Sequence, residues 1–282
     1  MSALAGAPEG PLAGKVALVV GASRGIGAAI AAAMARAGAT VVLAARDRQP
    51  LARVVAGIEA AGGQALALTV DVLEEESIHA LLGEVANRCG RLDAAVNNFS
   101  GGGRPPAPLA DWEAADFDST VATNLRGVFL CLKYQLKLMQ KNPDGGAIVN
   151  MSSTAGEQGV SGLAGYVASK FGVGGLTRVA ALDYAAAGIR VNAIAPGPIL
   201  TDHLAAAGPR AQEMAAAAVP LGRVGQVEDV AAAAVWLCST QSSFVTGTVL
   251  VVDGGRLAGV LAFNIGTGRG GKPWPKPAAT AR

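Results

Sequence analysis

The stretch KVALVVGASRGIG, residues 15–27, decides the fold of this 282-residue chain. Residues 15–20 form a short apolar run between Gly14 and Gly21, which indicates a buried β-strand. A glycine-rich turn follows at 21–27, and IGAAIAAAMARAG then indicates a helix that ends at Gly38. A strand, a glycine-rich turn and a helix in this order open a βαβ unit.

The same alternation continues along the chain. Further strands are expected at 40–45, 65–70, 92–98, 146–152, 189–195 and 248–253, and helices at 49–61, 74–88, 111–140, 163–187 and 226–238. Continuously apolar strands that alternate with helices indicate a parallel sheet covered on both faces. Right-handed crossovers then give an α/β fold, a doubly wound, Rossmann-like sheet of seven parallel strands.

The chain is expected to hold one domain, residues 14–255. No internal repeat or linker divides that region. Residues 1–13 are rich in Ala, Gly and Pro, and we expect a mobile N-terminal tail there. Residues 256–282 end in GRGGKPWPKPAATAR, a basic stretch rich in Gly and Pro, and we expect a partly disordered C-terminal extension.

Composition excludes several classes of function. Aromatic residues make up 4% of the chain and the net charge is +2, which argues against a nucleic-acid partner. The three cysteines are far apart and form no CxxC pair, so we expect no metal and a reducing cytoplasm as the location. Neither a signal peptide nor a membrane span is expected, because every apolar run is short or interrupted.

Polar and glycine residues gather where the expected strands end. GASRGIG follows the first strand, Ala45-Arg46 the second, Asp71-Val72 the third and Asn97-Asn98 the fourth. Ser152-Ser153 follows the fifth and PGPILT, residues 196–201, the sixth. Ligands of open α/β sheets bind beyond the carboxyl ends of the strands, so this edge is the expected binding site. Turn residues alone explain the whole set less well.

The glycine turn is the expected phosphate site. Gly21 permits the tight turn, while Gly25 and Gly27 let the backbone approach a ligand and let the helix pack closely on the strand. The free N–H groups and the dipole at the start of the following helix favour a phosphate. The spacing is G-x3-G-x-G rather than the commoner G-x-G-x-x-G. The interpretation as a phosphate site therefore depends on the position of the turn, which opens the first βαβ unit.

The end of the second strand distinguishes the two nicotinamide cofactors. An acidic residue there would bind the ribose hydroxyls of NAD, whereas this chain has Ala45 and Arg46, with Arg24 in the glycine turn. Two cations suit the 2′-phosphate of NADP, which we therefore expect in preference to NAD. Asp47 complicates this interpretation, because it is acidic and lies close to the usual position.

In order and spacing, these residues resemble the short-chain dehydrogenases/reductases of the single-domain kind. The resemblance runs from about 14 to 255 and includes VGASRGIG, VNN (96–98), NLRGVF (124–129), IVNMSS (148–153), YVASK, RVNAIAPGPILT and LVVDGG. It implies four catalytic residues, which fall on Asn124, Ser153, Tyr166 and Lys170. The candidate cofactor contacts are Gly21, Ser23, Arg24, Gly25, Ile26, Gly27, Arg46, Asp71, Val72, Asn98, Tyr166, Lys170, Pro196, Gly197, Ile199 and Thr201.

The resemblance also implies a role for each catalytic residue. Tyr166 would exchange a proton with a carbonyl or alcohol oxygen, and Lys170, one turn later, should lower the pKa of the phenol. Ser153 would hydrogen-bond the same oxygen, Asn124 would hold a water that links Lys170 to solvent, and Ser152 would cap or pack the strand end. A homotetramer or homodimer is implied, formed through the helices at 111–140 and 163–187.

One departure from the family pattern lies after the fourth strand. The family usually has Asn-Asn-Ala-Gly there, and this chain has Asn-Asn-Phe-Ser followed by GGGRPPAP. Phe99 is expected near the adenine ribose, and the loop 101–108 at the substrate mouth, with 154–163 and a helical lid at 199–220 as the other walls. The substrate itself cannot be read from these residues.

Three functions remain open. The leading one is an NADP(H)-dependent oxidoreductase acting on a ketone or secondary alcohol as small-molecule substrate. An enoyl- or dienoyl-thioester reductase is the second, although the family members of that kind usually have a longer Tyr–Lys spacing or lack the Tyr. A non-catalytic NADP-binding regulatory protein is the third, although such proteins usually lose part of the catalytic set.

Overall fold

The computed structural model describes residues 10–101 and 105–259. Its centre is a sheet of seven strands, and every pairing between neighbours is parallel. The strands are β1 (Val16–Val20), β2 (Thr40–Ala45), β3 (Gln64–Thr69), β4 (Ala94–Asn97), β5 (Gly146–Met151), β6 (Ile189–Pro196) and β7 (Val249–Val252). The predicted doubly wound α/β fold is confirmed.

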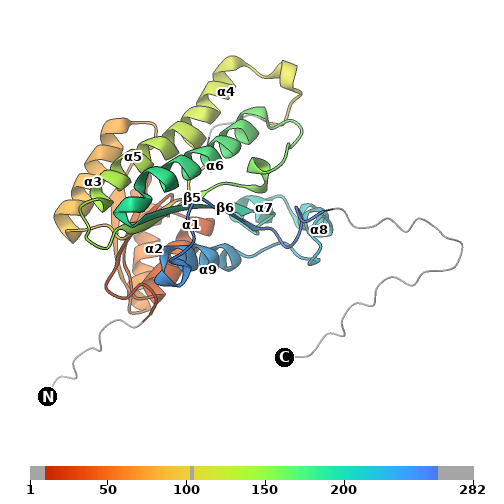
Figure 1. The fold of residues 1–282 in the computed structure, drawn as a ribbon. Helices are drawn as coiled ribbons and strands as arrows, with labels where there is room; N and C mark the ends of the chain where they lie inside the picture. The colour runs from red at the N-terminus through yellow and green to blue at the C-terminus, as the bar shows by residue number, and fades with distance from the viewer. Residues whose placement is uncertain (1–9, 102–104, 260–282) are drawn as a thin grey trace, which may run out of the picture.

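Helices cover both faces of the sheet (Figure 1). One face carries α3 (Glu75–Cys89), α4 (Ala114–Val121), α5 (Gly127–Met139) and α6 (Ala164–Tyr184). The other carries α1 (Gly25–Arg36), α2 (Arg48–Ala60) and α9 (Val227–Cys238). Two short helices, α7 (Asp202–Ala206) and α8 (Pro209–Ala217), stand beyond the end of β6.

Alternation along each strand divides the core into two clusters. In β1, Ala17 and Val19 face the cluster beneath α1, α2 and α9, whereas Val16, Leu18 and Val20 face the cluster beneath α3, α5 and α6. All five side chains are buried, because successive residues of a strand point to opposite faces and both faces are covered.

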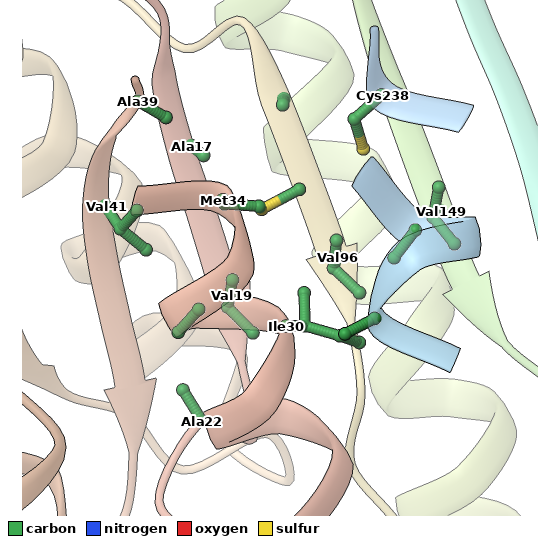
Figure 2. Packing of buried hydrophobic residues seen from close by; sticks show 14 of the residues in the cluster. Ala17, Val19, Ala22, Ile30, Met34, Ala39, Val41, Val96, Val149 and Cys238 are labelled. Atoms are coloured by element: carbon green, nitrogen blue, oxygen red, sulfur yellow. The ribbon is translucent and has the colours of Figure 1, made fainter. Parts of the chain in front are cut away.

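Small side chains let the helices lie close to the sheet. Figure 2 shows Ile30 and Met34 of α1 and Cys238 of α9 among strand residues such as Val96 and Val149. The neighbouring positions on α1 are mainly Ala, so the helix backbone approaches both the sheet and α9.

The strand order reverses its direction at one point of the sheet, between β1 and β4. From one side to the other the order is β3-β2-β1-β4-β5-β6-β7, so the chain leaves β1 and β4 in opposite directions. Ligands of this fold bind at such a switch point, beyond the carboxyl ends of the strands. The register pairs Val20 with Asn97 and Asn97 with Asn150, which brings the ends of β1, β4 and β5 level.

Two details differ from the sequence predictions. The expected mobile tail of residues 1–13 is wrong in its last part, because Leu12 is 1% exposed and its N–H donates to the Ala37 carbonyl at 2.9 Å. The expected helix at 111–140 is three consecutive pieces: α4, a π-helical turn η2 (Ala122–Arg126) and α5.

Short 3₁₀ turns complete the described elements. They are η1 (Leu109–Asp111), η3 (Thr154–Gly156), η4 (Ala185–Ala187) and η5 (Thr240–Ser242).

The expectations about the chain ends and membranes can be compared with the structure only in part. Residues 1–9 and all but the first four of the extension 256–282 lie outside the described residues. In the part of the chain that the structure describes, no helix is long and apolar enough to cross a membrane.

Candidate active site

Two glycines of the turn after β1, Gly21 and Gly27, have no room for a side chain. Gly21 has φ +85°, and a Cβ there would overlap the Asn98 carbonyl oxygen. A Cβ on Gly27 would overlap the Gly21 carbonyl oxygen and come within 2.6 Å of Asn98 Nδ2. Asn98 Nδ2 in turn donates to the Gly21 carbonyl oxygen at 3.2 Å, so the ends of β1 and β4 are fastened together.

The start of α1 is open to an anion. Arg24 is the N-cap residue in an extended conformation, and no side chain caps the first N–H groups of the helix. Gly25 has φ +54°, and the nearest atom to a Cβ there is Thr201 Cγ2 at 3.8 Å. Free N–H groups, a helix dipole and a glycine cradle fit a phosphate group. Ser23 and Ile26 are half-buried in the same turn.

Two cations lie where the adenosine end of a dinucleotide is expected. Arg24 and Arg46 are exposed, and neither forms an ion pair with another described residue. Asp47 is the N-cap residue of α2 but accepts no capping hydrogen bond. Asp71 follows β3 and accepts a hydrogen bond from the Leu73 N–H at 3.0 Å. Val72 packs against α5 at Gly127.

Ser153, Tyr166 and Lys170 come together beyond the end of β5. Ser153 follows the strand, and its Oγ accepts from the Ala155 N–H at 3.1 Å. The Ser153 side chain also lies near the phenol of Tyr166, which is in the first turn of α6, and it lowers the pKa of that phenol. Lys170 follows one turn later, with Nζ 5.5 Å from the centre of the Tyr166 ring. Three of the four candidate catalytic residues are therefore neighbours.

The pKa values of this cluster are set first by burial. Burial raises the pKa of Tyr166, and the nearby Ser153 side chain lowers it by less. Burial also lowers the pKa of Lys170 to about 8. The expected net lowering of the Tyr166 pKa is therefore wrong for the protein groups by themselves, because burial of the phenol outweighs the contacts that favour the phenolate.

Lys170 is tied to the strand that carries Ser153. It is 2% exposed, and Nζ donates to the Met151 carbonyl oxygen at 2.8 Å. Ser152 Oγ donates to the Lys170 carbonyl oxygen at 3.2 Å. The predicted role of Ser152 at the strand end is confirmed, and the two contacts fix α6 against β5.

Asn124 is buried in the π-helical turn, away from the hydrogen bonds of Lys170. Its Nδ2 donates to the carbonyl oxygens of Thr120 at 2.9 Å and Gly101 at 2.6 Å, and its Oδ1 accepts from the Gly101 N–H at 3.4 Å. The amide therefore fastens the segment after β4. The expected role of Asn124 in holding a water stays a prediction.

The stretch after β6 forms the base of the expected lid. Pro196 ends the strand, and the Gly197 N–H donates to the Val252 carbonyl oxygen at 2.9 Å. Ile199 pairs with Gly225 in an isolated parallel bridge, and Thr201 is the N-cap residue of α7. The excursion through α7 and α8 is closed by that bridge.

Comparison with known proteins agrees with this geometry. A family model described as enoyl-(acyl carrier protein) reductase matches residues 21–256. The chain is also 44% identical over 251 residues to an A-factor type gamma-butyrolactone 1′-reductase (1S-forming) of Streptomyces virginiae, covering 88% of this chain and 97% of the relative. The chain belongs to the short-chain dehydrogenases/reductases. It is thus an oxidoreductase of the family that transfers hydride between a nicotinamide cofactor and an alcohol or ketone.

Two further short-chain dehydrogenases/reductases extend the comparison. A cis-4-hydroxycyclohexanecarboxylate dehydrogenase of Sinomonas cyclohexanicum is 42% identical over 246 residues, covering 86% of this chain and 97% of the relative. A candidate 2-deoxy-D-gluconate 3-dehydrogenase of Agrobacterium tumefaciens, solved with bound NADP, matches with a TM-score of 0.79 and 36% identity. That match covers 87% of this chain and 97% of the other.

Phe99, where the chain departs from the family pattern, is half-buried and packs against the hydrophobic core. A Cβ on Gly127 would lie 3.0 Å from the edge of the Phe99 ring, and Phe99 packs against the cluster beneath α3, α5 and α6. The backbone at Asn98 still meets Gly21 closely. The ring therefore lies beside α5, and the expectation that the adenine ribose lies near it stays a prediction.

Sequence reasoning missed a buried amide network beneath the active site of this short-chain dehydrogenase/reductase. Asn97 Nδ2 donates to Gln135 Oε1 at 3.0 Å and to Asn150 Oδ1 at 2.9 Å, and Asn150 Nδ2 donates to Thr177 Oγ1 at 3.1 Å. The signal was present, because Asn97 is the last residue of β4 and Asn150 is the last but one of β5, and the fold pairs the two. Among the described residues, no cluster of His, Cys, Asp or Glu could hold a metal ion.

Proposed function

We propose that this protein is an NADP(H)-dependent oxidoreductase that interconverts a ketone and a secondary alcohol, with Tyr166 as the acid/base. The observation that carries the proposal is the meeting of Ser153, Tyr166 and the buried Lys170, with Lys170 Nζ 5.5 Å from the centre of the Tyr166 ring. A buried phenol with a high pKa is protonated at neutral pH, so it is ready to donate a proton.

Each residue has a defined part in the proposed reaction. In the reductive direction the Tyr166 hydroxyl donates its proton to the carbonyl oxygen, and the Ser153 hydroxyl hydrogen-bonds that oxygen. In the reverse direction Tyr166 accepts the alcohol proton. Lys170 supplies a cation behind the ring that stabilises the phenolate form when Tyr166 has lost its proton. The nicotinamide, when bound, supplies or accepts the hydride.

The glycine turn and its two arginines support NADP(H) as the cofactor. The turn from Gly21 to Gly27 would take the phosphates at the start of α1. Arg24 and Arg46 would face the 2′-phosphate, since both are exposed and without an acidic partner among the described residues. Lys170 and Tyr166 would bind the nicotinamide end, and Asp71, Val72 and Asn98 the adenosine end. Pro196, Gly197, Ile199 and Thr201 would border the nicotinamide.

A second candidate is reduction of an enoyl thioester. The description of the matching family model favours it. Carbonyl chemistry is favoured instead by the four-residue spacing of Tyr166 and Lys170 and by the nearness of Ser153 to Tyr166. These residues place a proton donor, the Tyr166 phenol, beside the Ser153 hydroxyl that would bind a carbonyl oxygen. An assay of NADPH oxidation that offers both a ketone and an enoyl thioester separates the two reactions.

The proposal includes a cytoplasmic homodimer or homotetramer. Large apolar side chains stand exposed along α5 and α6, including Phe129, Phe171, Val179 and Leu182. A second copy of this chain packed against these helices would remove them from water. Sedimentation of the purified protein measures the assembly directly.

The decisive experiment follows NADPH oxidation with a panel of carbonyl compounds. The panel holds a β-ketoacyl thioester, an enoyl thioester, an aromatic ketone, a steroid ketone and a sugar ketone, and Tyr166→Phe is the control. A turnover that needs Tyr166 with any ketone supports the proposal. Turnover of the enoyl thioester alone would move the function to the second candidate. Absence of NADPH binding would contradict both.

A further inference from the structure

The segment that follows β4 is fastened to the loop that precedes Tyr166. The Ala107 N–H donates to the Gly162 carbonyl oxygen at 3.2 Å. A Cβ on Gly162, whose φ is +81°, would lie 2.8 Å from Pro106 Cβ. Residues 105–108 therefore lie directly on the chain between Ser153 and Tyr166, on the side where the substrate mouth is expected.

Trp112 joins this segment to the first turn of α6. Its Nε1 donates to the Ala107 carbonyl oxygen at 3.2 Å. A Cβ on Gly165 would lie 3.0 Å from Cζ3 of the Trp112 ring, so the ring packs on the backbone of α6. Gly165 immediately precedes Tyr166. One half-buried indole thus contacts both the mouth segment and the residue next to the proposed acid.

The ring lies where α4 meets α6. Thr120 of α4 flanks the same glycine, with its Cβ 3.1 Å from the position of a Gly165 Cβ. The Thr120 hydroxyl donates to the Asp116 carbonyl oxygen at 2.8 Å, and the Thr120 carbonyl oxygen accepts from Asn124 Nδ2. Within α6, Ser169 Oγ donates to the Gly165 carbonyl oxygen at 2.7 Å. The ring therefore packs at a close contact between the two helices.

We propose that Trp112 is a positioning residue with two separable actions. Its six-membered ring holds the start of α6 so that the Tyr166 hydroxyl stays within reach of Ser153. Its indole N–H holds residues 105–108 against the loop 154–163 and so keeps the substrate mouth in shape. The roles in turnover rest on the proposed function, whereas the positioning itself does not.

Two substitutions separate these actions. Trp112→Phe keeps an aromatic ring but removes the donor to Ala107, so KM for the ketone rises about fivefold while kcat stays within about twofold of wild type. Trp112→Ala also removes the packing on Gly165, so kcat falls about tenfold or more, because a misplaced acid loses its reach. The Kd for NADPH stays within about twofold of wild type in both variants, since the glycine turn is formed by other residues.

The matched controls are the same substitutions at Trp236, which is half-buried in α9 on the other face of the sheet. They change stability without changing kcat or KM. Equal loss of kcat in Trp112→Ala and Trp236→Ala, scaled to the folded fraction, would overturn the proposal, because a merely structural tryptophan gives that result.

Amide hydrogen exchange tests the positioning without any substrate. In Trp112→Ala, exchange is faster at Ala107 and in residues 162–169 than in wild type, while Trp236→Ala leaves both unchanged. Ala107 reports for the segment 105–108, because its other three residues are prolines without an amide N–H. If exchange is faster in Trp112→Ala but wild type shows no turnover, the proposed function is wrong and the positioning role of Trp112 still holds. Unchanged exchange in both segments would overturn the positioning, whatever the assay shows.

Discussion

The Lys170 ammonium group is hydrogen-bonded to the main chain of β5: Nζ donates to the carbonyl oxygen of Met151, the last residue of the strand, at 2.8 Å. Met151 lies two residues before Ser153, so the lysine that stands behind Tyr166 also anchors the strand end that carries the serine. The partner is neutral and the site is buried, which is why the pKa of Lys170 falls to about 8.

The first prediction is a pH-dependent stability that Lys170 causes. Its pKa is about 8 in the folded protein against 10.5 as the ordinary value, so folding releases its proton between these two pH values. Stability from this group therefore rises as pH rises from 8 to 10.5, and the full cost of burying the ammonium is present below pH 8. The measurement is the free energy of unfolding of wild type and Lys170→Met across this range. Their difference changes by about 3 kcal/mol in favour of wild type.

Lys137 supplies the control for that experiment. It is exposed near the end of α5, so Lys137→Met controls for the loss of one lysine from the surface. A constant difference between wild type and Lys170→Met from pH 8 to 10.5 would contradict the lowered pKa.

The second prediction concerns the proposed acid. Tyr166→Phe removes the hydroxyl while keeping the ring, so kcat for ketone reduction falls by about 10²–10⁴ and NADPH still binds. Steady-state kinetics and the fluorescence of bound NADPH measure the two effects. Tyr184, half-buried at the end of α6, provides the matched Tyr184→Phe control, which keeps normal turnover. Turnover by Tyr166→Phe close to that of wild type would remove Tyr166 from the mechanism.

The third prediction tests the choice of cofactor. Arg46→Ala removes an exposed cation at the end of β2, so the Kd for NADPH rises about tenfold while the Kd for NADH changes little. Arg53→Ala, an exposed arginine farther along α2, is the matched control and changes neither value. An equal loss of affinity for both cofactors would show that Arg46 does not read the 2′-phosphate.

The fourth prediction compares two glycines in helices. A Cβ on Gly27 would overlap the Gly21 carbonyl oxygen, so Gly27→Ala must shift α1 or the turn, and the Kd for NADPH rises by at least about tenfold. Gly57 lies in α2 with nothing near its Cβ position, so Gly57→Ala raises stability by about 0.5–1 kcal/mol. Thermal unfolding and NADPH titration of both variants check the pair. Normal NADPH affinity in Gly27→Ala would mean that the turn does not hold the phosphates.

The positions of the strands along the chain and their parallel arrangement were predictable, because buried strands appear in this sequence as short apolar runs. KVALVV and TVVLAA are short apolar runs between glycines or polar residues, and such runs in an α/β alternation have few arrangements. The gathering of Ser153, Tyr166 and Lys170 was predictable from the resemblance, since the spacing from strand end to helix matches the family. The structure brings the three together as expected.

What sequence reasoning could not supply depends on side-chain geometry. The apolar pattern around Asn124 reads as one continuous helix, and only the backbone shows the π-helical turn there. Leu12 is a single apolar residue in a Gly/Pro-rich stretch, so nothing local reveals that it is buried. The pKa direction of Tyr166 was also missed, because desolvation depends on packing from several distant segments.

The π-helical turn makes the number of residues between β4 and β5 matter as well as their identity. A π-turn holds one residue more than ordinary winding needs, and each residue of an α-helix turns the chain by about 100°. Deleting one residue from 122–126 would restore regular winding and leave α4 and α5 in nearly the same phase, because a π-turn and an α-turn each complete one rotation. Asn124 would then leave the widened turn from which it binds Gly101, although every helix could still form. For anyone grafting or shortening this enzyme, the residue count of this turn is therefore a constraint that substitution scanning alone would never reveal.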